Sequence, residues 1–571
     1  MRYHALACDY DGTIATHGSL LDDTRAALEK LRSTGRKVIL VTGRRIDDLH
    51  TVCSDLSPFD IVVGENGAVL YWPASRELRT LAEPPPEQLW QQLLARGVTE
   101  VARGKVIVAT WQPYETTVLA VIRELGLEMQ VIFNKGAVMV LPSGVNKATG
   151  LRAALDHLKL SAHNVVGVGD AENDHALLAA CECGVAVANA VPMLREKADL
   201  VTAADHGAGV VQLIDRLISN DLAELAPRLS RHDLPIGTDP KGETVTLPAY
   251  GTNVLLAGTS GAGKSTFATA FIERLDEQAY QYCVVDPEGD YGGLPGAVTV
   301  GTQQAAPSTD EISKLLDKPL QNGVVNLLGV GLGDRPAFFR SLMPDLQAAR
   351  NLTGRPHFVI LDEVHHLAPE DNVAGGFSPT EGANNLFMIT VHPSHVSRAL
   401  LTAVDAMVVV GTRPREMLSE LATTIGVVAP AVDTGPLKAG EALVWWPHRG
   451  EAPRRITTIP STVERRRHIR KYADGEIQPE RSFYFRGPKG ALNLRAQNLM
   501  SFLQIGDGVD DETWQFHLRS GDYSRWLEQV IKDRPLAEEV AEVERNEGEA
   551  GVAETRRAVR EAIERRYTNP A

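Results

Sequence analysis

Polar side chains able to handle a phosphate group follow short apolar runs at several places near the N-terminus. They comprise two carboxylates, a hydroxyl, an ammonium and a later acidic cluster: Asp9, Asp11, Thr42, Lys147, Asp170, Asn173 and Asp174. The runs before them, such as Val38 to Val41, read as buried parallel strands. Because the carboxyl ends of parallel strands line one crevice of an open α/β sheet, these side chains are expected to meet there.

This mixture suits the hydrolysis of a phosphate monoester. The substrate is a dianion that would repel a bare carboxylate, and Mg²⁺ held by oxygen ligands neutralises both partners. A carboxylate nucleophile then divides the reaction into two easier steps through a covalent aspartyl-phosphate. A hydroxyl and an ammonium stabilise the phosphoryl oxygens as charge shifts between them.

The order of these motifs resembles the haloacid dehalogenase superfamily over roughly residues 1–220. The motifs are Asp9-Tyr10-Asp11-Gly12-Thr13, Thr42-Gly43-Arg44, Lys147 and Gly167 to Asp174. Gly64 to Ala68 and Gly184 to Ala190 resemble its Cof-type branch. The resemblance implies a Rossmann-like α/β domain with an inserted α/β cap, expected at about residues 82–142.

The resemblance also implies a role for each residue. Asp9 would be the nucleophile and Asp11 the general acid and base. Thr42 and Lys147 would bind the phosphoryl group. Asp170 would ligate Mg²⁺ beside Asp9 and the Asp11 carbonyl, and Asn173 and Asp174 would support the metal and the lysine.

A second phosphate site is predicted between an apolar run, Asn253 to Ala257, and a helix-like run from Phe267. The segment is Gly258-Thr259-Ser260-Gly261-Ala262-Gly263-Lys264-Ser265-Thr266, a P-loop pattern in the strand–loop–helix context it needs. Its backbone N–H groups are expected to surround the β-phosphate of ATP, while Lys264 reaches the β- and γ-phosphates and Ser265 ligates Mg²⁺. Asp362 and Glu363 end a later apolar run, His357 to Leu361. Asp362 is expected in the Mg²⁺ shell, and Glu363 is placed to polarise water.

Residues 233–460 resemble the HerA/FtsK group of ring-forming ATPases. The resemblance rests on the P-loop and on Cys283 to Tyr291, Asp362 to Leu367 and Met388 to Val396. It implies a RecA-like α/β domain, a homo-oligomer such as a hexameric ring, and an arginine supplied by a neighbouring subunit. Thr390 and His392 are candidate γ-phosphate sensors, whereas Arg413, Arg449, Arg454 and Arg455 are equal candidates for the arginine. For His365 and His366, packing or capping is favoured over metal binding, because neighbours on a helix point to different faces.

Length and composition bound the remaining possibilities. The chain has 571 residues, which predicts about three or four domains. A net charge of -15 argues against nonspecific nucleic-acid binding by the whole surface. Five scattered cysteines suit a reducing compartment, and the single Cys181-x-Cys183 pair is weak evidence for zinc. No apolar run approaches the ~20 residues of a membrane span, so a cytoplasmic protein is expected.

The rest of the chain is predicted as connecting and accessory segments. Residues 221–232 read as a charged linker, and 461–571 as a small α+β domain followed by a charged helical tail. The tail is a solvated or an oligomerisation helix. The aromatic residues between Phe483 and Trp526 favour a core over a base-stacking platform. The basic run Glu464 to Lys471 favours a solvated helix or linker over a phosphate- or nucleic-acid-binding patch.

Three functions therefore stay open. The first is a phosphatase for a small phosphorylated metabolite, a sugar phosphate or a phosphoglycolate-like acid, controlled by ATP or by ring assembly. The second is a nucleic-acid translocating machine whose phosphatase acts on nucleic-acid ends or nucleotides. The third is a nucleotide-sensing regulator. A cap that excludes water and large ligands favours the first, and the ATPase resemblance favours the second.

Overall fold

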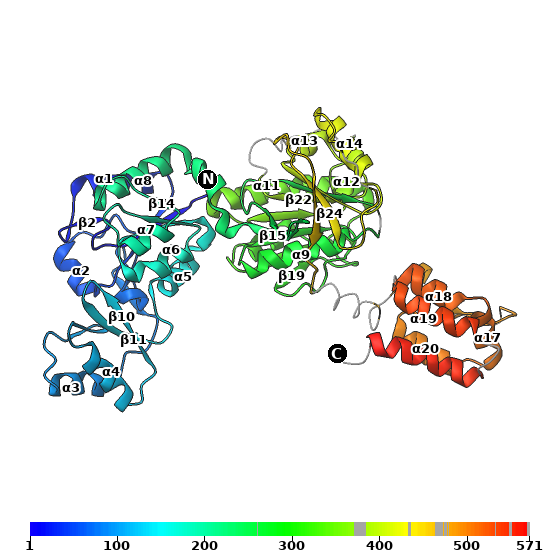
Figure 1. Ribbon diagram of the computed structural model, residues 1–571, viewed down its shortest axis with the longest axis horizontal. Helices are drawn as coiled ribbons and strands as arrows, with labels where there is room; N and C mark the ends of the chain where they lie inside the picture. The colour runs from blue at the N-terminus through cyan, green and yellow to red at the C-terminus, as the bar shows by residue number, and fades with distance from the viewer. Residues whose placement is uncertain are drawn as a thin grey trace. The chain divides into compact units, whose positions relative to one another are not determined.

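The computed structural model describes residues 1–259, 261–370, 384–431, 435–462, 472, 477, 479–490, 492–531, 533–546 and 551–567. The chain divides into two compact units, Met1–Ile459 and Pro460–Ala571. The first unit contains two α/β modules, each built on its own large sheet (Figure 1). The basic run Glu464 to Lys471 lies outside the described residues.

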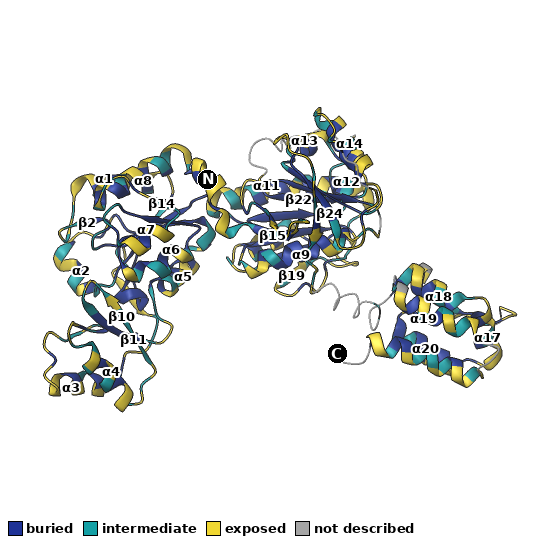
Figure 2. Cartoon of the chain, in the orientation of Figure 1, coloured by how far each residue is buried: buried dark blue, intermediate teal, exposed yellow. Residues whose placement is uncertain are grey.

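The N-terminal module is built on an eight-stranded sheet in the order β14-β13-β12-β1-β4-β5-β6-β7. Its strands are Ala5–Cys8 (β1), Lys37–Val41 (β4), Ile61–Gly64 (β5), Val69–Trp72 (β6), Glu77–Thr80 (β7), Val165–Gly169 (β12), Cys183–Ala186 (β13) and Leu200–Val201 (β14). The strands from β14 to β5 are parallel, whereas β6 and β7 continue the sheet antiparallel. The central strands are wholly buried (Figure 2), as expected for a parallel sheet covered on both faces.

Helices cover this sheet and connect its strands. They are Asp22–Ser33 (α1), Ile46–Val52 (α2), Lys147–Leu158 (α5), His175–Ala180 (α6), Pro192–Lys197 (α7) and His206–Asn220 (α8). Helix α1 packs against α8, and α5 packs against α6. A short hairpin, Ala15–Thr16 (β2) with Ser19–Leu20 (β3), follows the first strand.

The cap is inserted between β7 and α5. It consists of the strands Ala102–Arg103 (β8), Val108–Trp111 (β9), Met129–Asn134 (β10) and Ala137–Pro142 (β11), with the helices Glu87–Ala95 (α3) and Glu115–Glu124 (α4). The strands form a separate four-stranded antiparallel sheet in the order β10-β11-β9-β8. Leu89, Leu93, Val118 and Val121 pack with this sheet to give the cap its own small core.

The second module is built on an eleven-stranded sheet in the order β16-β15-β25-β24-β23-β17-β22-β21-β18-β20-β19. The strands are Leu234–Thr238 (β15), Thr244–Leu247 (β16), Val254–Gly258 (β17), Tyr282–Asp286 (β18), Ala297–Val300 (β19), Asn322–Asn326 (β20), Phe358–Leu361 (β21), Leu386–Thr390 (β22), Ala406–Val410 (β23), Glu441–Trp445 (β24) and Arg454–Thr458 (β25). From β23 to β19 the strands are parallel, and from β23 outward to β16 they are antiparallel.

The helices of this module are Lys264–Glu277 (α9), Thr309–Leu316 (α10), Arg335–Thr353 (α11), Val364–Leu367 (α12), Arg398–Leu401 (α13) and Pro414–Ile425 (α14). Helix α9 starts directly after the glycine-rich segment and packs on β15 and β17. Strand β22 lies between β17 and β21, so the carboxyl ends of these three strands are neighbours.

The segment predicted as a linker, residues 221–232, is folded onto the first module. Two 3-10 helices, Ala223–Arg228 and Ser230–His232, occupy it. Leu222, Leu225 and Leu229 are buried in the core of the N-terminal module. Apolar spacing of three and four residues gives the segment one buried face, which its charged residues conceal in the sequence.

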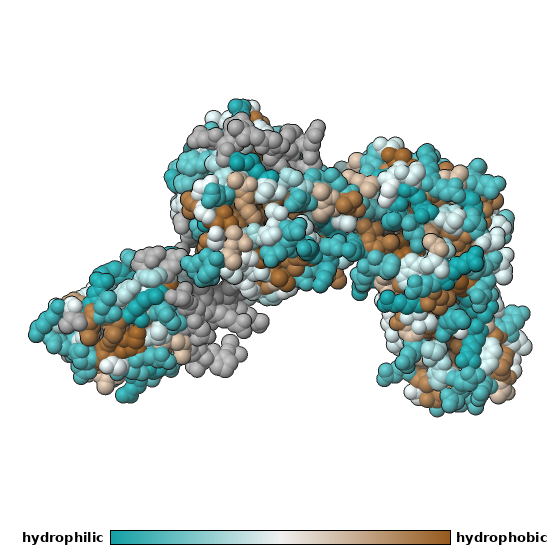
Figure 3. Space-filling view, turned by 180° about the vertical axis from the view of Figure 1, so that it is seen from behind, coloured by the Kyte–Doolittle hydropathy of each residue, from teal (hydrophilic) through white to brown (hydrophobic). Residues whose placement is uncertain are grey.

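The C-terminal unit contains one hairpin, Phe483–Phe485 (β26) with Leu494–Ala496 (β27), among its described residues. Its helices are Leu499–Gly508 (α16), Asp511–Arg519 (α17), Asp522–Trp526 (α18), Arg534–Arg545 (α19) and Val552–Tyr567 (α20). Phe483, Phe485, Trp514 and Tyr523 lie in one aromatic core. Figure 3 shows hydrophobic side chains on part of its surface as well.

The predicted tail belongs to this same unit, because Val559, Ile563 and Tyr567 of α20 are buried in its core. None of the described helices is both long and apolar enough to cross a membrane.

Candidate active site

The first candidate site lies at the carboxyl ends of three neighbouring strands, which position its side chains. Strand β1 ends at Cys8 and places Asp9 at the carboxyl edge of the sheet. Strand β12 pairs with β1 on one side and ends before Asp170, while β4 pairs on the other side and ends before Thr42. Asp9 therefore lies between the acidic group and the hydroxyl, as the spacing of the motifs predicts.

Lys147 is held at this edge by the start of α5. The Asn146 side chain caps the helix, with Thr149 completing a capping box. The Lys147 Nζ donates to Asp9 Oδ1 at 2.5 Å and to Asp174 Oδ1 at 2.6 Å. The backbone N–H groups of Asp170 and Ala171 both donate to Asp174 Oδ2 at 2.9 Å. Asp174 thus fixes the lysine on one oxygen and the loop carrying Asp170 on the other.

This ammonium–carboxylate cluster is almost completely withdrawn from solvent. The exposed fraction is 1% for Lys147, 5% for Asp9, 2% for Asp170 and 0% for Asp174. Burial, with the Asp174 and Asp170 carboxylates, raises the pKa of Asp9 to about 8 although Lys147 lowers it. Burial also raises the pKa of Asp170. Burial alone would lower the pKa of Lys147, but Asp174 and Asp9 raise it. Lys147 pairs with Asp9 and Asp174, and Lys135 of the cap pairs with Asp170, so the three carboxylates still exceed the two ammonium groups in charge.

A hard divalent cation fits this donor set. Oxygens of Asp9, Asp170 and Asp174 lie within 4.8 Å of one another, and oxygen is the ligand that Mg²⁺ prefers. The Oδ1 atom of Asn173 is buried without a hydrogen-bond partner among the described residues. Gly12, with φ of +87°, lets the chain pass close to Asp170, because a Cβ there would lie 2.3 Å from Asp170 Oδ2.

The side chain of Asp11 points away from the cluster and pairs with Arg44. Arg44 donates from Nε to Asp11 Oδ2 at 2.6 Å and from Nη2 to Oδ1 at 2.7 Å. The Asp11 backbone carbonyl accepts from the Lys135 Nζ at 3.3 Å. Thr42 is buried, and its Oγ1 accepts from the Arg44 backbone N–H at 3.1 Å. For the acid and base role that the family resemblance implies, the Asp11 carboxylate would have to break its contacts with Arg44 and turn toward a group bound at Asp9.

The cap supplies a residue that the sequence did not single out. Lys135 lies in the turn between β10 and β11 and donates to Asp170 Oδ2 at 2.6 Å. Because the Asp11 carbonyl and Asp170 are two of the predicted metal ligands, this ammonium occupies the edge of the predicted ion site. Gly136, which follows Lys135 and has φ of +87°, is typical of a turn, but the sequence does not indicate that this turn reaches the neighbouring domain.

The Glu65 carboxylate accepts hydrogen bonds from a second turn of the cap. Its Oε1 accepts from the Lys105 N–H at 2.8 Å, and its Oε2 accepts from the Val106 and Ile107 N–H groups at 2.7 and 2.9 Å. Glu65 is 1% exposed. Next to it, the Asn66 Oδ1 accepts from the Asn173 Nδ2 at 3.1 Å. The Gly64 to Ala68 motif therefore links the cap to the loop that carries Asp170.

The second candidate site lies at the carboxyl edge of the larger sheet. Strand β17 ends at the buried Gly258, and α9 begins at Lys264. Gly261 and Gly263 have φ of +75° and +94°, and added Cβ atoms there would meet nothing within 4 Å. Ala262 and Ser265 are partly exposed, Thr266 is exposed, and Ser260 lies outside the described residues. The described part of the loop is therefore open at its glycines, and N–H groups at a helix start suit an anion.

Acidic residues face this loop from two further strands. Asp362 and Glu363 follow β21, and Asp286 ends β18. Burial, followed by the Asp286 and Glu363 charges, raises the pKa of Asp362 well above its usual range. Burial raises the pKa of Glu363 too, whereas Lys264 lowers it. Burial raises the pKa of Asp286 to about 6. A divalent cation would relieve this repulsion.

Thr390 is placed between the loop and these acids by β22. It is fully buried, and its Oγ1 lies 3.1 Å from the His365 Nδ1 and accepts from the His392 N–H at 3.1 Å. His365 and His366 contact each other with ring centroids 4.1 Å apart. The four candidate arginines each pair or stack locally: Arg413 with Glu416, Arg449 with Trp446, Arg454 with Glu451 and Arg455 with Glu441.

Comparison with known proteins identifies the first module. Residues 6–90 and 105–214 match the family of haloacid dehalogenase-like hydrolases. The chain belongs to this family through that N-terminal part.

Among its relatives, phosphoglycolate phosphatase of Methanothermobacter thermautotrophicus is 31% identical over 223 residues, covering 38% of this chain and 98% of the relative. Phosphoglycolate phosphatase 2 of Saccharolobus solfataricus is 27% identical over 229 residues, covering 38% of this chain and 94% of the relative. A solved haloacid dehalogenase-like hydrolase from Bacteroides thetaiotaomicron is 18% identical, with a TM-score of 0.33, over 38% of this chain and 99% of that structure.

Proposed function

We propose that the N-terminal module is a Mg²⁺-dependent phosphatase acting on a small phosphorylated acid. The observation that carries this proposal is the Lys147 ammonium, shared between Asp9 and Asp174 beside Asp170 at the end of the central strands. The group is buried and preorganised, so a phosphoryl group would meet fixed charges rather than water.

The residues divide the reaction as follows. Asp9 attacks phosphorus through a carboxylate oxygen, the bond between phosphorus and the leaving alkoxide breaks, and Asp11 donates its proton to that alkoxide. Asp11 then accepts a proton from water, which attacks the aspartyl-phosphate, releases inorganic phosphate and restores Asp9. Lys147 and Thr42 hold the phosphoryl oxygens. Asp9, Asp170 and the Asp11 carbonyl would hold Mg²⁺, which when bound would supply charge neutralisation and polarisation of the phosphoryl group.

The cap contributes a charged side chain that could select the substrate. Lys135 brings a positive charge over the crevice from the cap side, where the part of the substrate beyond its phosphate would lie. A carboxylate or hydroxyl in that part would accept from the ammonium. Two relatives named phosphoglycolate phosphatase favour a phosphoglycolate-like acid over a sugar phosphate.

The phosphatase proposal is tested with an Asp9→Asn variant and an aryl phosphate substrate. We expect Mg²⁺-dependent hydrolysis to disappear while the fold is retained, because the variant loses the nucleophile and little volume. Asp47→Asn, at an exposed carboxylate of α2, serves as the matched control. Full turnover by Asp9→Asn would overturn the proposal. A panel of phosphorylated acids and sugars then ranks the substrates by kcat/KM.

We also propose that the second module binds and hydrolyses ATP with Mg²⁺. The open loop between β17 and α9, with Lys264 at the helix start, supports this proposal, as does Asp362 after β21, which is separated from β17 by β22 alone. Glu363 would polarise the attacking water. Lys264→Ala is expected to abolish ATP hydrolysis, with Lys241→Ala in an exposed turn as its control. Unchanged hydrolysis would exclude this site.

A HerA/FtsK-like ring, probed by sedimentation velocity with and without ATP, remains part of this second proposal. In it, a neighbour's arginine completes each ATP site, and ATP binding or ring assembly controls the phosphatase. If duplex DNA stimulates the ATPase in a salt-sensitive way, the nucleic-acid machine replaces the metabolite phosphatase as the preferred function. Nucleotide binding without hydrolysis would favour the nucleotide-sensing regulator.

A further inference from the structure

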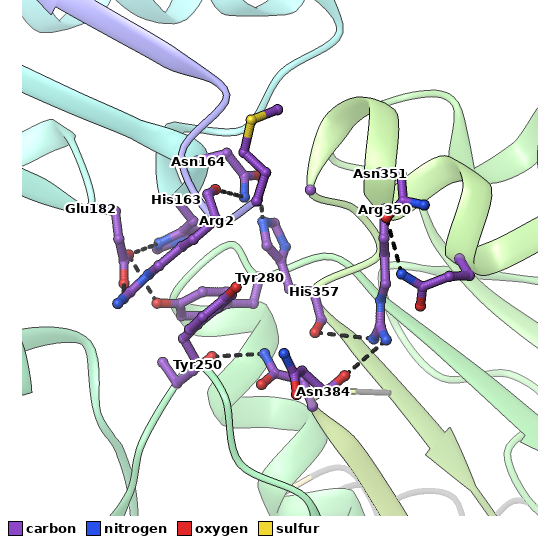
Figure 4. A pocket seen from close by; sticks show the side chains of 15 residues that line it. Arg2, His163, Asn164, Glu182, Tyr250, Tyr280, Arg350, Asn351, His357 and Asn384 are labelled. Atoms are coloured by element: carbon purple, nitrogen blue, oxygen red, sulfur yellow. Dashed lines mark hydrogen bonds and ion pairs between the residues drawn. The ribbon is translucent and has the colours of Figure 1, made fainter. Parts of the chain in front are cut away.

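The two modules of the first unit join at the amino ends of their strands, away from both candidate sites. From the first module, Arg2, Asn164 and Glu182 precede β1, β12 and β13. From the second, Tyr280 and His357 precede β18 and β21. These residues line a cavity of about 140 Å³, drawn in Figure 4. The joint contains several ionisable groups that neither proposed reaction uses.

Each ring nitrogen of His163 lies opposite an oxygen atom that can accept a hydrogen bond. Its Nε2 lies 2.7 Å from the backbone carbonyl oxygen of Gln278, and its Nδ1 lies 2.7 Å from Glu182 Oε2. The carbonyl only accepts, so Nε2 must carry a hydrogen. A neutral ring then presents a lone pair at Nδ1 to a carboxylate oxygen. That contact is repulsive unless a proton lies between the two atoms, or unless they move apart to bind one metal ion.

His232, from the segment between the modules, approaches the same carboxylate. Its Nε2 is buried without a hydrogen-bond partner among the described residues and lies 3.8 Å from the same Glu182 Oε2. One ring nitrogen of each histidine therefore lies near one carboxylate oxygen, and the second ring nitrogen of His163 is hydrogen-bonded to the backbone.

The Glu182 carboxylate is buried, and other side chains hold both of its oxygens in place. Its exposed fraction is 2%, and its Oε1 pairs with Arg2, which holds the group ionised. The Tyr280 hydroxyl donates to Oε2 at 3.1 Å. The ligand atoms of His163, Glu182 and His232 all lie within 4.8 Å of one another. One nitrogen from each of two imidazoles and one carboxylate oxygen therefore lie close enough to bind a single ion.

Other ionisable side chains nearby, His357, Cys181 and Cys183, do not point a free ligand atom at Glu182. The Nδ1 of His357 accepts from the Gln281 N–H at 2.9 Å, and its Nε2 lies 3.2 Å from the Asn164 Oδ1. Because Asn164 directs its Nδ2 to the Arg2 carbonyl, its Oδ1 is free to accept, and His357 is satisfied as a neutral ring. Cys181 and Cys183 flank Glu182 in the sequence, but their thiols are not among the converging ligand atoms.

We propose that His163, Glu182 and His232 bind a divalent transition-metal ion of the zinc class at this joint. Two nitrogens and one oxygen suit Zn²⁺, whereas Mg²⁺ and Ca²⁺ take oxygen ligands. Metal-binding histidines usually donate their second ring N–H to a carbonyl, as His163 does here to the Gln278 backbone. The ion would join the segment before β15 to the edge of the first sheet, beside the end of α9.

The test measures Zn²⁺ and Co²⁺ binding to the full chain in excess Mg²⁺, with Asp170→Asn as the background that disables the first candidate site. We expect one equivalent of metal to bind and Co²⁺ to show the visible absorption of a low-coordinate nitrogen–oxygen site. Adding His232→Ala or Glu182→Gln should weaken binding by about 100-fold or more, beyond the loss caused by removing an outer partner. His448→Ala, exposed in the second module, should leave binding unchanged.

Thermal unfolding supplies a second readout. Zn²⁺ should raise the unfolding temperature of the Asp170→Asn chain but not of the chain that also carries His232→Ala. Equal metal affinity with and without His232 would overturn the proposal. So would the absence of binding in the Asp170→Asn background, since the 2.7 Å contact between His163 and Glu182 would then be a hydrogen bond within the protein.

Discussion

Replacing Lys135 with alanine tests whether the cap contributes directly to the chemistry. The Lys135 Nζ lies 2.6 Å from Asp170 Oδ2 and 3.3 Å from the Asp11 carbonyl oxygen, where Mg²⁺ is expected to bind. Ion and ammonium cannot share that position, so binding of Mg²⁺ must displace Lys135 toward the substrate. The variant should therefore bind Mg²⁺ more tightly and substrate more weakly.

The two effects differ in size. The Lys135 side chain is 47% exposed, so its ion pair with Asp170 contributes only about 1 kcal/mol. Removing it should raise the Mg²⁺ affinity about five-fold. A hydrogen bond from a charged donor to the substrate contributes roughly 1.5–3 kcal/mol, so kcat/KM at saturating Mg²⁺ should fall about 10- to 100-fold, mainly through KM.

Calorimetric Mg²⁺ titration and steady-state kinetics measure these quantities separately. Lys105→Ala is a suitable control, because its exposed side chain belongs to the other cap turn and its N–H contact with Glu65 is retained. A Lys135→Ala variant with unchanged Mg²⁺ affinity and unchanged kcat/KM would refute the reasoning. A lower kcat at constant KM would place the ammonium on the reacting phosphoryl group instead.

Three further changes probe the same module. Glu65→Gln replaces one of the two oxygens that accept from three cap N–H groups with an NH2 donor, so at least one of these hydrogen bonds is lost. We therefore expect kcat/KM to fall about ten-fold, and unchanged kinetics would exclude a role for this contact in holding the cap. The Asp9 pKa of about 8 means that, at low Mg²⁺, the rate should rise as pH increases through that value, and the midpoint should move to lower pH as Mg²⁺ is added. Since this folded-state pKa is raised, ionising Asp9 costs stability as pH rises, and Mg²⁺ should raise the unfolding temperature more above about pH 8 than below it. A midpoint independent of Mg²⁺ would contradict both. Leu225→Ala should reduce the free energy of unfolding by roughly 2–4 kcal/mol in denaturant titrations, whereas the exposed Leu21→Ala should change it little.

The sequence predicts the parts of the first site that single strands carry. Asp9, Thr42 and Asp170 follow apolar runs, and parallel strands necessarily bring their carboxyl ends together. Lys135 and Glu65 could not be found this way. Their contacts depend on how the cap docks against the sheet, which no local periodicity encodes. The pairing of Asp11 with Arg44 is likewise a choice of side-chain conformation that the motif does not contain.

Segments rich in charge conceal part of the fold in the sequence. The charges of residues 221–232 predict a linker, yet Leu222, Leu225 and Leu229 are buried. The charged helix α20 buries Val559, Ile563 and Tyr567, which recur every four residues. A one-sided apolar stripe can decide burial even where charged residues are in the majority.

The joining of the two modules at the amino ends of their strands has a consequence for access and for evolution. Each crevice opens at the opposite edge of its own sheet, so a ligand as large as a nucleic acid could occupy one without obstructing the other. A product released at one would have to diffuse through bulk solvent to reach the other, which argues against channelling between them. The loops that shape each crevice lie away from the joint. Substrate preference could therefore diversify in either module through loop changes alone, while the contacts that hold the pair together stayed intact.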